Sequence, residues 1–236
     1  MNNKKIESKI DLTPKTAYLT GVIIGDGNLC GSTKSKTDLS PDYRISIDIS
    51  DKEYLLSIEK IIKSIIQTKT IPKQPHQRGN RIPRWYLAIR NKELFNFLCK
   101  EMEIPKGKKS NIVGIPSKIL KSSDEIKKHF LAGYFDTDGG FRGNALGFTM
   151  ASKTLWEDVS KLLDYFNISL SKDRWINKKY NKEFFGIRIR KSEIDNFLKI
   201  LPLQNKEKLG RIQNRFKCGD AGVAKRDRGL SKTVQA

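Results

Sequence analysis

Two aspartates, Asp26 and Asp138, each follow a short apolar segment and each precede a glycine. They stand 138 − 26 = 112 residues apart, in a chain of 236 residues whose formal net charge is +20. Carboxylate oxygens are ligands that Mg²⁺ prefers, and phosphate oxygens can complete its coordination shell. A matched pair of carboxylates inside a strongly basic protein therefore indicates a metal site that acts on nucleic acid.

The segments before both aspartates have the pattern of two helices that pack closely. Gly21 and Gly25 are four residues apart, as are Gly133 and Thr137, so each pair lies on one helix face. Small residues on facing stripes let two backbones approach, which would bring the helix ends side by side. Carboxylates at helix C-termini are disfavoured by the helix dipole and repel each other. A divalent cation between them would relieve this, whereas a single Asp-Gly is the common turn that closes a helix.

Both segments resemble the LAGLIDADG motif of the homing endonucleases, and two copies resemble the single-chain, pseudo-dimeric members of that family. The copy at residues 19–27 agrees with the motif at Leu19, Gly21, Ile23, Asp26 and Gly27. The copy at residues 131–139 agrees at Leu131, Ala132, Gly133, Asp136, Asp138 and Gly139. The first copy departs at Thr20 and at Ile24, where the motif has its first acid. In the family that first acid is not the metal-binding one, so both metal-binding positions are kept.

The resemblance implies a site-specific double-strand DNA endonuclease that hydrolyses phosphodiesters at a long, asymmetric target. It implies two or three Mg²⁺ ions shared between Asp26 and Asp138, with the backbone carbonyls of Gly25 and Thr137 also approaching the ions. Such ions polarise the phosphate, generate the nucleophile from water and stabilise the leaving oxygen.

The family also places a lysine near the scissile phosphate, four residues before an Asn-Phe-Leu-like segment. Lys92 stands four residues before Asn96, and Lys191 is adjacent to Ser192, the corresponding position in the second half. The resemblance thus gives Lys92 and Lys191 catalytic roles, in electrostatic stabilisation or in activating water. For both, the alternative is a solvated surface lysine.

A repeat beyond the motifs predicts the fold. Asn96-Phe97-Leu98 recurs as Asn196-Phe197-Leu198, and alternating apolar residues at 45–49 and 146–150 have the period of half-buried strands. We predict an α+β protein with two pseudo-symmetric αββαββα halves, the motif helices packed at a central seam and curved antiparallel sheets forming a DNA-binding saddle. The boundaries would be 1–103 for the first half, 104–121 for a connector, 122–204 for the second half and 205–236 for a basic extension. The elements are expected near 14–26, 28–50, 52–66, 69–91 and 92–102, and near 123–138, 140–151, 153–166, 169–190 and 192–200.

Local signals mark the ends of the motif helices. Thr13 before Pro14 is typical of a helix start. Ser122 with Glu125 has the spacing of a capping box. Gly27 and Gly139 are suited to the left-handed position that ends a helix.

The strands are predicted to supply a DNA-binding face, because alternation turns one set of side chains away from the core. Two-stranded ribbons fit the major groove, where Arg, Lys, Asn and Gln read base edges. In the first half the candidates are Asn28, Arg44, Ser46, Asp48, Gln74, Gln77, Arg78, Arg81, Arg84, Tyr86 and Arg90. In the second half they are Arg142, Asn144, Thr149, Arg174, Asn177, Lys179, Tyr180, Lys182, Arg188 and Arg190.

Composition limits the partner and the compartment that we expect for this protein. Lys and Arg outnumber Asp and Glu by 46 to 26 along the whole chain, so a polyanion is the natural partner. Three cysteines far apart and two histidines argue against a disulfide framework and a zinc site. No apolar run could span a bilayer, and no signal peptide is expected. We therefore predict an intracellular protein in a reducing compartment, either the cytoplasm of a prokaryote or the matrix of an organelle.

Alternatives remain on the same scaffold. Intron RNA maturases and non-cleaving DNA-binding regulators resemble this family, and a maturase would bind RNA as well as DNA. The presence of both Asp26 and Asp138 favours the enzyme. We expect a free-standing monomer without an obligate protein partner rather than an intein-embedded nuclease, with a basic helix over 206–217.

Overall fold

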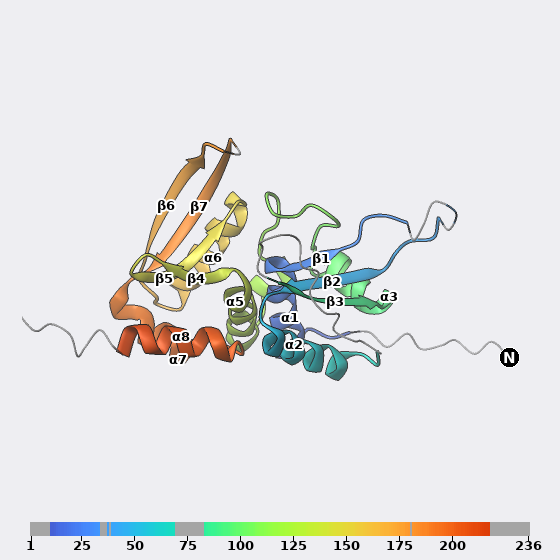
Figure 1. The fold of residues 1–236 in the computed structure, drawn as a ribbon, viewed down its shortest axis with the longest axis horizontal. Helices are drawn as coiled ribbons and strands as arrows, with labels where there is room; N and C mark the ends of the chain where they lie inside the picture. The colour runs from blue at the N-terminus through green and yellow to red at the C-terminus, as the bar shows by residue number, and fades with distance from the viewer. Residues whose placement is uncertain (1–9, 34–36, 38, 69–82, 180, 218–236) are drawn as a thin grey trace, which may run out of the picture.

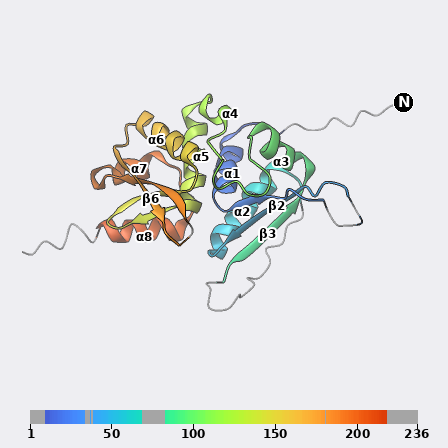
Figure 2. The same ribbon diagram turned by 90° about the horizontal axis from the view of Figure 1, so that it is seen from above.

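Helices α1 (Pro14–Gly25) and α5 (Asp124–Asp138), one from each half of the chain, lie side by side at the centre of the computed structural model (Figure 1). A view from above shows the same pair between two lateral α+β halves (Figure 2). The structure describes residues 10–33, 37, 39–68, 83–179 and 181–217. The predicted α+β class and the central seam are therefore confirmed.

Each half follows the predicted order of elements. The first half contains α1, β1 (Gly27–Leu29), β2 (Arg44–Ile49), α2 (Lys52–Ile65), β3 (Trp85–Arg90), α3 (Lys92–Asn96) and a π-helical turn (Phe97–Glu101). The second contains α5, β4 (Gly139–Arg142), β5 (Ala145–Met150), α6 (Lys153–Tyr165), β6 (Leu170–Asn177), β7 (Lys182–Ile189), a 3-10 turn (Lys191–Glu193) and α7 (Ile194–Ile200). The second half is thus αββαββα. In the first half, the predicted strand before β3 falls in 69–82, outside the described residues.

Two antiparallel sheets place the motif acids at equivalent corners. The described strands are ordered β1-β2-β3 in the first sheet and β4-β5-β7-β6 in the second. Gly27, next to Asp26, pairs with Ile47, and Gly139, next to Asp138, pairs with Phe148. Helix α2 packs on one face of the first sheet and α6 on the matching face of the second. The repeat seen in the sequence is therefore a repeat in three dimensions.

The seam is tight because glycines leave no space between the helix backbones. A Cβ added to Gly21 would lie 2.2 Å from the carbonyl oxygen of Phe130, and one added to Gly133 would lie 2.1 Å from that of Tyr18. The rings of Tyr18 and Phe130 are fully buried. The small-residue stripes predicted from the sequence are the surfaces that meet.

Of the two predicted helix starts, one is confirmed and one is wrong. Thr13 caps α1 through the backbone N–H of Thr16, as expected. Ser122 is not the cap of α5, because the helix starts one residue later with Ser123 as N-cap, and the Ser122 hydroxyl donates to the carbonyl of Ile119.

Gly27 and Gly139 are also not in the left-handed conformation, contrary to expectation. Gly139 has φ −76°, and the described glycines with positive φ are Gly107 and Gly143. Packing explains why these positions are glycine. An added Cβ would lie 2.6 Å from Cα of Ile23 at Gly27, and 2.1 Å from the ring of Phe135 at Gly139.

The two segments assigned outside the repeat each contain a helix. The connector 104–121 contains a short helix, α4 (Ser117–Leu120), and the extension forms the expected basic helix, α8 (Lys206–Lys217). Ile212 of α8 is buried. No helix among the described residues is long and apolar enough to cross a membrane.

Candidate metal and nucleic-acid site

Asp26 and Asp138 meet across the end of the seam. Asp26 is the C-cap of α1, and Asp138 is the last residue of α5. A Cβ built on Gly25 would lie 3.5 Å from the carboxyl carbon of Asp138 and 2.1 Å from Oγ1 of Thr137. Each motif therefore ends against the end of the other, and this close approach requires glycine at position 25.

Both carboxyl groups are costly to ionise, and Asp26 adds to the cost of ionising Asp138. Burial and the negative charge of Asp26 raise the pKa of Asp138 to about 6, from its usual 3.8. Burial also raises the pKa of Asp26, although the neighbouring Arg84 opposes this shift. Charge repulsion in a partly desolvated corner is the condition that a bound cation relieves.

The donors present fit a hard divalent cation. The two carboxylates and the carbonyls of Gly25 and Thr137 are all oxygen donors, which Mg²⁺ accepts while keeping several waters. Among the described residues, no group of three or more His, Cys, Asp or Glu side chains could hold a metal ion. A cation here would thus depend on a two-carboxylate site completed by other oxygens.

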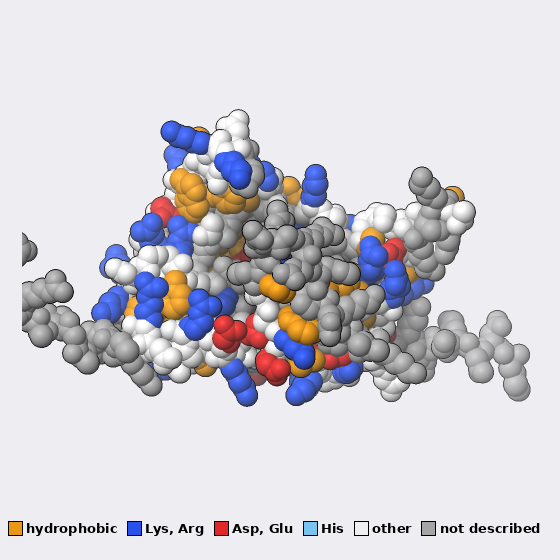
Figure 3. Space-filling view, in the orientation of Figure 1, with side chains coloured by type: hydrophobic (Ala, Val, Ile, Leu, Met, Phe, Trp, Pro, Cys, Tyr) orange, Lys and Arg blue, Asp and Glu red, His pale blue; other side chains and the backbone are white. Residues whose placement is uncertain are grey.

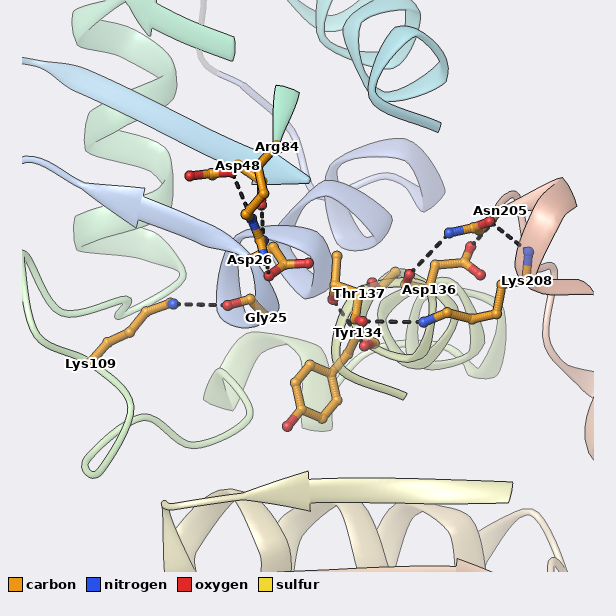
Figure 4. A network of polar contacts seen from close by, with 11 residues as sticks. Gly25, Asp26, Asp48, Arg84, Lys109, Tyr134, Asp136, Thr137, Asn205 and Lys208 are labelled. Carbon is orange, nitrogen blue, oxygen red and sulfur yellow. Dashed lines mark hydrogen bonds and ion pairs between the residues drawn. The ribbon is translucent and has the colours of Figure 1, made fainter. Parts of the chain in front are cut away.

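Two lysines that the sequence reasoning missed reach the ends of the motif helices (Figure 4). Lys109, in the connector, donates from Nζ to the carbonyl of Gly25 at 3.2 Å. Lys208, in α8, donates to the carbonyl of Thr137 at 3.2 Å, and also to those of Phe135 at 2.8 Å and Gly139 at 2.7 Å. Each lysine therefore donates a hydrogen bond to the carbonyl of the residue that precedes a motif acid.

The surroundings of both lysines shift their pKa values. Burial lowers the pKa of Lys208 to about 8, an effect that the nearby acids Asp136, Asp26 and Asp138 oppose. Burial also lowers the pKa of Lys109, against the charges of Asp138 and Asp26. Desolvated lysines beside carboxylates are typical of sites that stabilise developing negative charge or move protons.

Lys92 and Lys191 are not brought to the acids. Lys92 is exposed, and its Nζ lies 5.9 Å from the ring centroid of Tyr43. It follows the end of β3 where Arg90 pairs with Arg44, the end of the sheet away from Asp26. Lys191 is exposed just after β7. The Asn-Phe-Leu spacing therefore identified an equivalent position in the two halves but not the lysine at the site.

Lys109 and Lys208 stand at similar distances after the Asn-Phe-Leu segment of their half. Lys109 stands 109 − 96 = 13 residues after Asn96, and Lys208 stands 208 − 196 = 12 residues after Asn196. One lies in the assigned connector and the other in the assigned extension, two segments that had been set apart from the repeat. The two distances differ by one residue and the two segments differ in secondary structure, so this spacing alone does not predict that both lysines reach the site.

Arg84 links the first motif acid to strand β2. Its Nη2 lies 3.2 Å from Oδ1 of Asp26, and its Nε donates to Oδ1 of Asp48 at 2.7 Å. Its guanidinium also donates to the backbone carbonyl of Asp48. The residue was predicted to contact DNA, and in this structure it contacts Asp26.

Asp136, the first acid of the second motif, holds α8 against the seam. It is buried and accepts from the hydroxyl of Tyr18 at 2.7 Å. The same oxygen accepts from the backbone N–H of Gln204 at 2.7 Å and of Asn205 at 3.2 Å. Burial raises the pKa of Asp136, and these donors oppose the shift. Ile24 occupies the equivalent position of the first motif, so this anchor exists in one half only.

A cavity of about 270 Å³ lies beside the acids, between the two halves. Its walls come from α1, the start of α2, the start of β3, α5 and α8. It is lined by Asp26, Ile49, Ser50, Asp51, Arg84, Asp136, Thr137, Asn205, Glu207, Lys208 and Arg211. The cavity gives solvent access to the end of the seam.

The predicted DNA-facing side chains in the first sheet share one face. Arg44, Ser46 and Asp48 alternate with buried isoleucines, and the strand pairing puts Asn28 and Tyr86 on the same side. Arg90 on this face pairs with the buried Asp42 at 3.1 Å, and Arg44 approaches the same carboxylate at 3.6 Å. Gln74, Gln77, Arg78 and Arg81 lie outside the described residues.

In the second sheet the structure places two candidates differently from the others. Arg174 is on the opposite face from Arg188, the face that α6 covers, and pairs with Glu183 at 3.9 Å. Arg142 has a side chain only 14% exposed, held by Asp173 at 3.2 Å. Arg188 also pairs with Asp173, at 3.0 Å, and projects into solvent. The remaining candidates Asn144, Thr149, Asn177, Lys179, Lys182 and Arg190 are exposed or half-buried, and Tyr180 lies outside the described residues.

The surface distribution of charge follows these elements (Figure 3). Lys and Arg gather over the β6–β7 hairpin and over α8, while acidic side chains gather where α8 approaches α2. The basic face is therefore made by the strands and by the extension rather than by a single tail.

Two α+β halves joined by glycine-rich motif helices, with paired acids at the helix ends, make an architecture similar to that of two-motif LAGLIDADG proteins. Residues 125–202 match the family model of the LAGLIDADG-like domain. Among curated relatives, a replication factor C small subunit of Methanocaldococcus jannaschii is 28% identical over 86% of this chain, which spans 10% of that protein's length. An uncharacterized protein of the same organism is 24% identical over 86% of this chain and 73% of its own.

Solved structures agree in fold. The homing endonuclease I-DmoI, in complex with DNA and Ca, has a TM-score of 0.63 at 18% identity, over 86% of this chain and 98% of its own. I-WcaI, a homing endonuclease bound to its DNA recognition sequence, has a TM-score of 0.58 at 17% identity, over 90% and 89%. The N-terminal LAGLIDADG domain of DUF199/WhiA has a TM-score of 0.54 at 15% identity, over 89% and 90%. The resemblance predicted from the motifs is confirmed: residues 125–202 match the LAGLIDADG-like domain, and the chain has the fold of the single-chain homing endonucleases.

Proposed function

We propose that this protein is a metal-dependent DNA endonuclease that cuts both strands of a long, asymmetric site. The observation that carries the proposal is the pairing of Asp26 and Asp138 across the seam, each beside a carbonyl that a half-buried lysine reaches. A purely structural role leaves unexplained why a tightly packed seam ends in two carboxylates that repel each other.

In this mechanism Asp26 and Asp138 hold divalent cations, with Mg²⁺ as the proposed ion. Bound there, the ions supply Lewis acidity toward the phosphate and a more acidic water. Lys109 and Lys208 place positive charge at the two helix ends, where negative charge develops on the phosphate. Lys208, with a pKa of about 8, also holds a proton that can be moved near neutral pH.

The sheets are proposed to bind double-stranded DNA through their outward faces. Arg90 and Arg188 are oriented by Asp42 and Asp173 and reach solvent, as an arginine that reads a base edge requires. The halves differ at equivalent positions, for example Ala88 against Arg188, so the half-sites they bind need not match. One chain supplies both halves, and we propose that it acts as a monomer.

The ligands present in structures of I-DmoI support the proposed function. Structures of I-DmoI were determined in complex with DNA and with Mn, Ca or Mg. The alternative on this scaffold is an RNA maturase or a non-cleaving DNA-binding regulator. Those proteins need no ionised pair at the seam, so the retention of both acids favours the nuclease.

The test is cleavage of a randomised duplex library in Mg²⁺, with the cut ends sequenced. We expect a single preferred site cut on both strands. Asp26→Asn and Asp138→Asn should abolish cutting while retaining binding of the recovered duplex, and Asp195→Asn on the exposed surface of α7 should cut normally. Binding without cleavage by the wild type in Mg²⁺ or Mn²⁺ would favour the regulator, and normal cutting by either motif variant would refute the metal site.

A further inference from the structure

Arg84 occupies the carboxylate that a metal ion would need. Its Nη2 lies 3.2 Å from Oδ1 of Asp26, a distance that leaves no space for a cation between these two atoms. A guanidinium and a metal ion both neutralise a carboxylate, and they compete for its oxygens. The first motif acid is therefore engaged by a charge from its own chain.

The second half has no such group in the equivalent place. The strand repeat aligns Leu87 with Ile187, so Phe184 corresponds to Arg84. Phe184 stacks on Trp175, with ring centroids 6.0 Å apart, and carries no charge. Among the described residues, Asp138 has no ion pair within 4.0 Å. The two acids thus differ in how readily a cation can reach them.

Charge balance shows why this matters. Lys109, Lys208 and Arg84 bring three positive charges to the motif pair Asp26 and Asp138 and to the neighbouring Asp48 and Asp136 before any metal ion binds. The lysines are fixed by hydrogen bonds to backbone carbonyls. Arg84 alone reaches a motif carboxylate, and its side chain is 49% exposed at the border of the cavity. It is the cation of the three that can move.

Asp48 gives this movement a pivot. It accepts from Nε of Arg84 at 2.7 Å and lies exposed on the DNA-facing side of β2. Arg84 can therefore keep the side chain of Asp48 through Nε while Nη2, which also donates to the Asp48 carbonyl, turns from Asp26 toward a phosphate. DNA would supply both the phosphate that attracts Arg84 and the negative charge that favours metal ions.

We propose that Arg84 is an internal cation that holds Asp26 while the protein is free and releases it when DNA binds. Binding of a divalent cation at Asp26 is then coupled to DNA, which would prevent the free protein from carrying a fully loaded site. This inference rests on the proposed function, because it assigns a regulatory role at the same two acids.

The test measures Mn²⁺ binding to the protein without DNA, from the electron paramagnetic resonance signal of free Mn²⁺. Arg84→Gln should bind Mn²⁺ about two- to fivefold more tightly than the wild type, the change expected from losing one exposed ion pair. Adding Asp26→Asn to Arg84→Gln should remove the gain. Arg90→Gln, which removes a guanidinium from an ion pair on the same sheet, should show no gain.

Two further measurements test whether the gain depends on the charge at position 84 and on the absence of DNA. Arg84→Lys retains the positive charge and should bind Mn²⁺ as the wild type does. With the duplex recovered from cleavage selection, the affinities of wild type and Arg84→Gln should converge. Equal or weaker Mn²⁺ binding by Arg84→Gln, or the same gain in Arg90→Gln, would overturn the role of Arg84.

Failure of the proposed function gives a different pattern. Mn²⁺ binding by the wild type would then be insensitive to both Asp26→Asn and Asp138→Asn, with or without DNA. Metal binding that depends on these acids but not on Arg84 would leave the nuclease standing and remove only the coupling.

Discussion

Lys109 and Lys208 reach equivalent atoms of the two motif helices. Each Nζ lies 3.2 Å from the carbonyl oxygen of the residue before a motif acid, Gly25 for one and Thr137 for the other. One lysine comes from the connector and the other from the helix after the repeat. Two segments with no common secondary structure thus deliver the same group to both sides of the seam.

Replacing either lysine should impair cleavage. Lys208→Met and Lys109→Met are expected to slow plasmid cutting in Mg²⁺ by about 10²-fold or more, because each removes a charge or proton donor at the phosphate. Binding of the recovered duplex in Ca²⁺ should change little. Lys92→Met and Lys191→Met serve as controls, and loss of cutting in these instead would restore the assignment made from spacing.

The seam should not tolerate an added methyl group. Gly21→Ala places a Cβ against the rigid backbone of α5 and should lower the free energy of unfolding by about 1–3 kcal/mol or more. Thermal unfolding followed by circular dichroism measures this. Gly210→Ala in α8 has open space around the new Cβ and should be neutral or slightly stabilising. An unchanged melting temperature for Gly21→Ala would contradict the close approach of the helices.

Asp136 is expected to be a structural anchor. Asp136→Ala removes the acceptor of the backbone amides of Gln204 and Asn205, at a cost of about 1–3 kcal/mol for a buried group left unpaired. The Tyr18 hydroxyl loses the same acceptor but keeps the Tyr54 hydroxyl as a partner. Hydrogen exchange should show α8 losing protection before the seam does. Asp195→Ala, at an exposed site, is the control, and equal protection of α8 in both variants would argue against the anchor.

The pH dependence of stability should report on Asp138. Its pKa is about 6 in the folded protein and 3.8 ordinarily, so between these values the folded state keeps a proton that the unfolded state has released. Stability of the metal-free protein therefore falls as pH rises from about 4 to 6. Asp138→Asn should raise the melting temperature at pH 7.5 and much less at pH 4. The gain should stay below about 1 kcal/mol, since solvent reaches the side chain.

DNA binding should weaken steeply with salt. A protein that neutralises six to ten phosphates loses roughly 10³- to 10⁵-fold in affinity between about 50 and 200 mM salt. Gel-shift titrations with the recovered duplex measure the slope. Arg188→Gln should weaken binding, whereas Arg174→Gln, on the opposite face of the hairpin, should not. A flat salt response would argue against an extended DNA interface.

Much of the fold could be predicted because its signals are local. The period of apolar residues located α2 and α6, and Thr13-Pro14 located the start of α1. Glycine spacing predicted the seam, since the small residues of each motif helix lie on one face. Gly27 and Gly139 were assigned the wrong conformation because a glycine required for packing looks the same in sequence as one required for a turn.

The sequence by itself determined the repeat, the paired acids and the stripes of small residues, because each depends on spacing along one helix or strand. Tertiary structure alone decided which cations reach those acids. Lys109, Lys208 and Arg84 come from three separate segments, and their positions depend on where each segment packs rather than on any local period. Long flexible side chains can reach a site from many points on a surface, so only the folded arrangement selects among 46 basic residues.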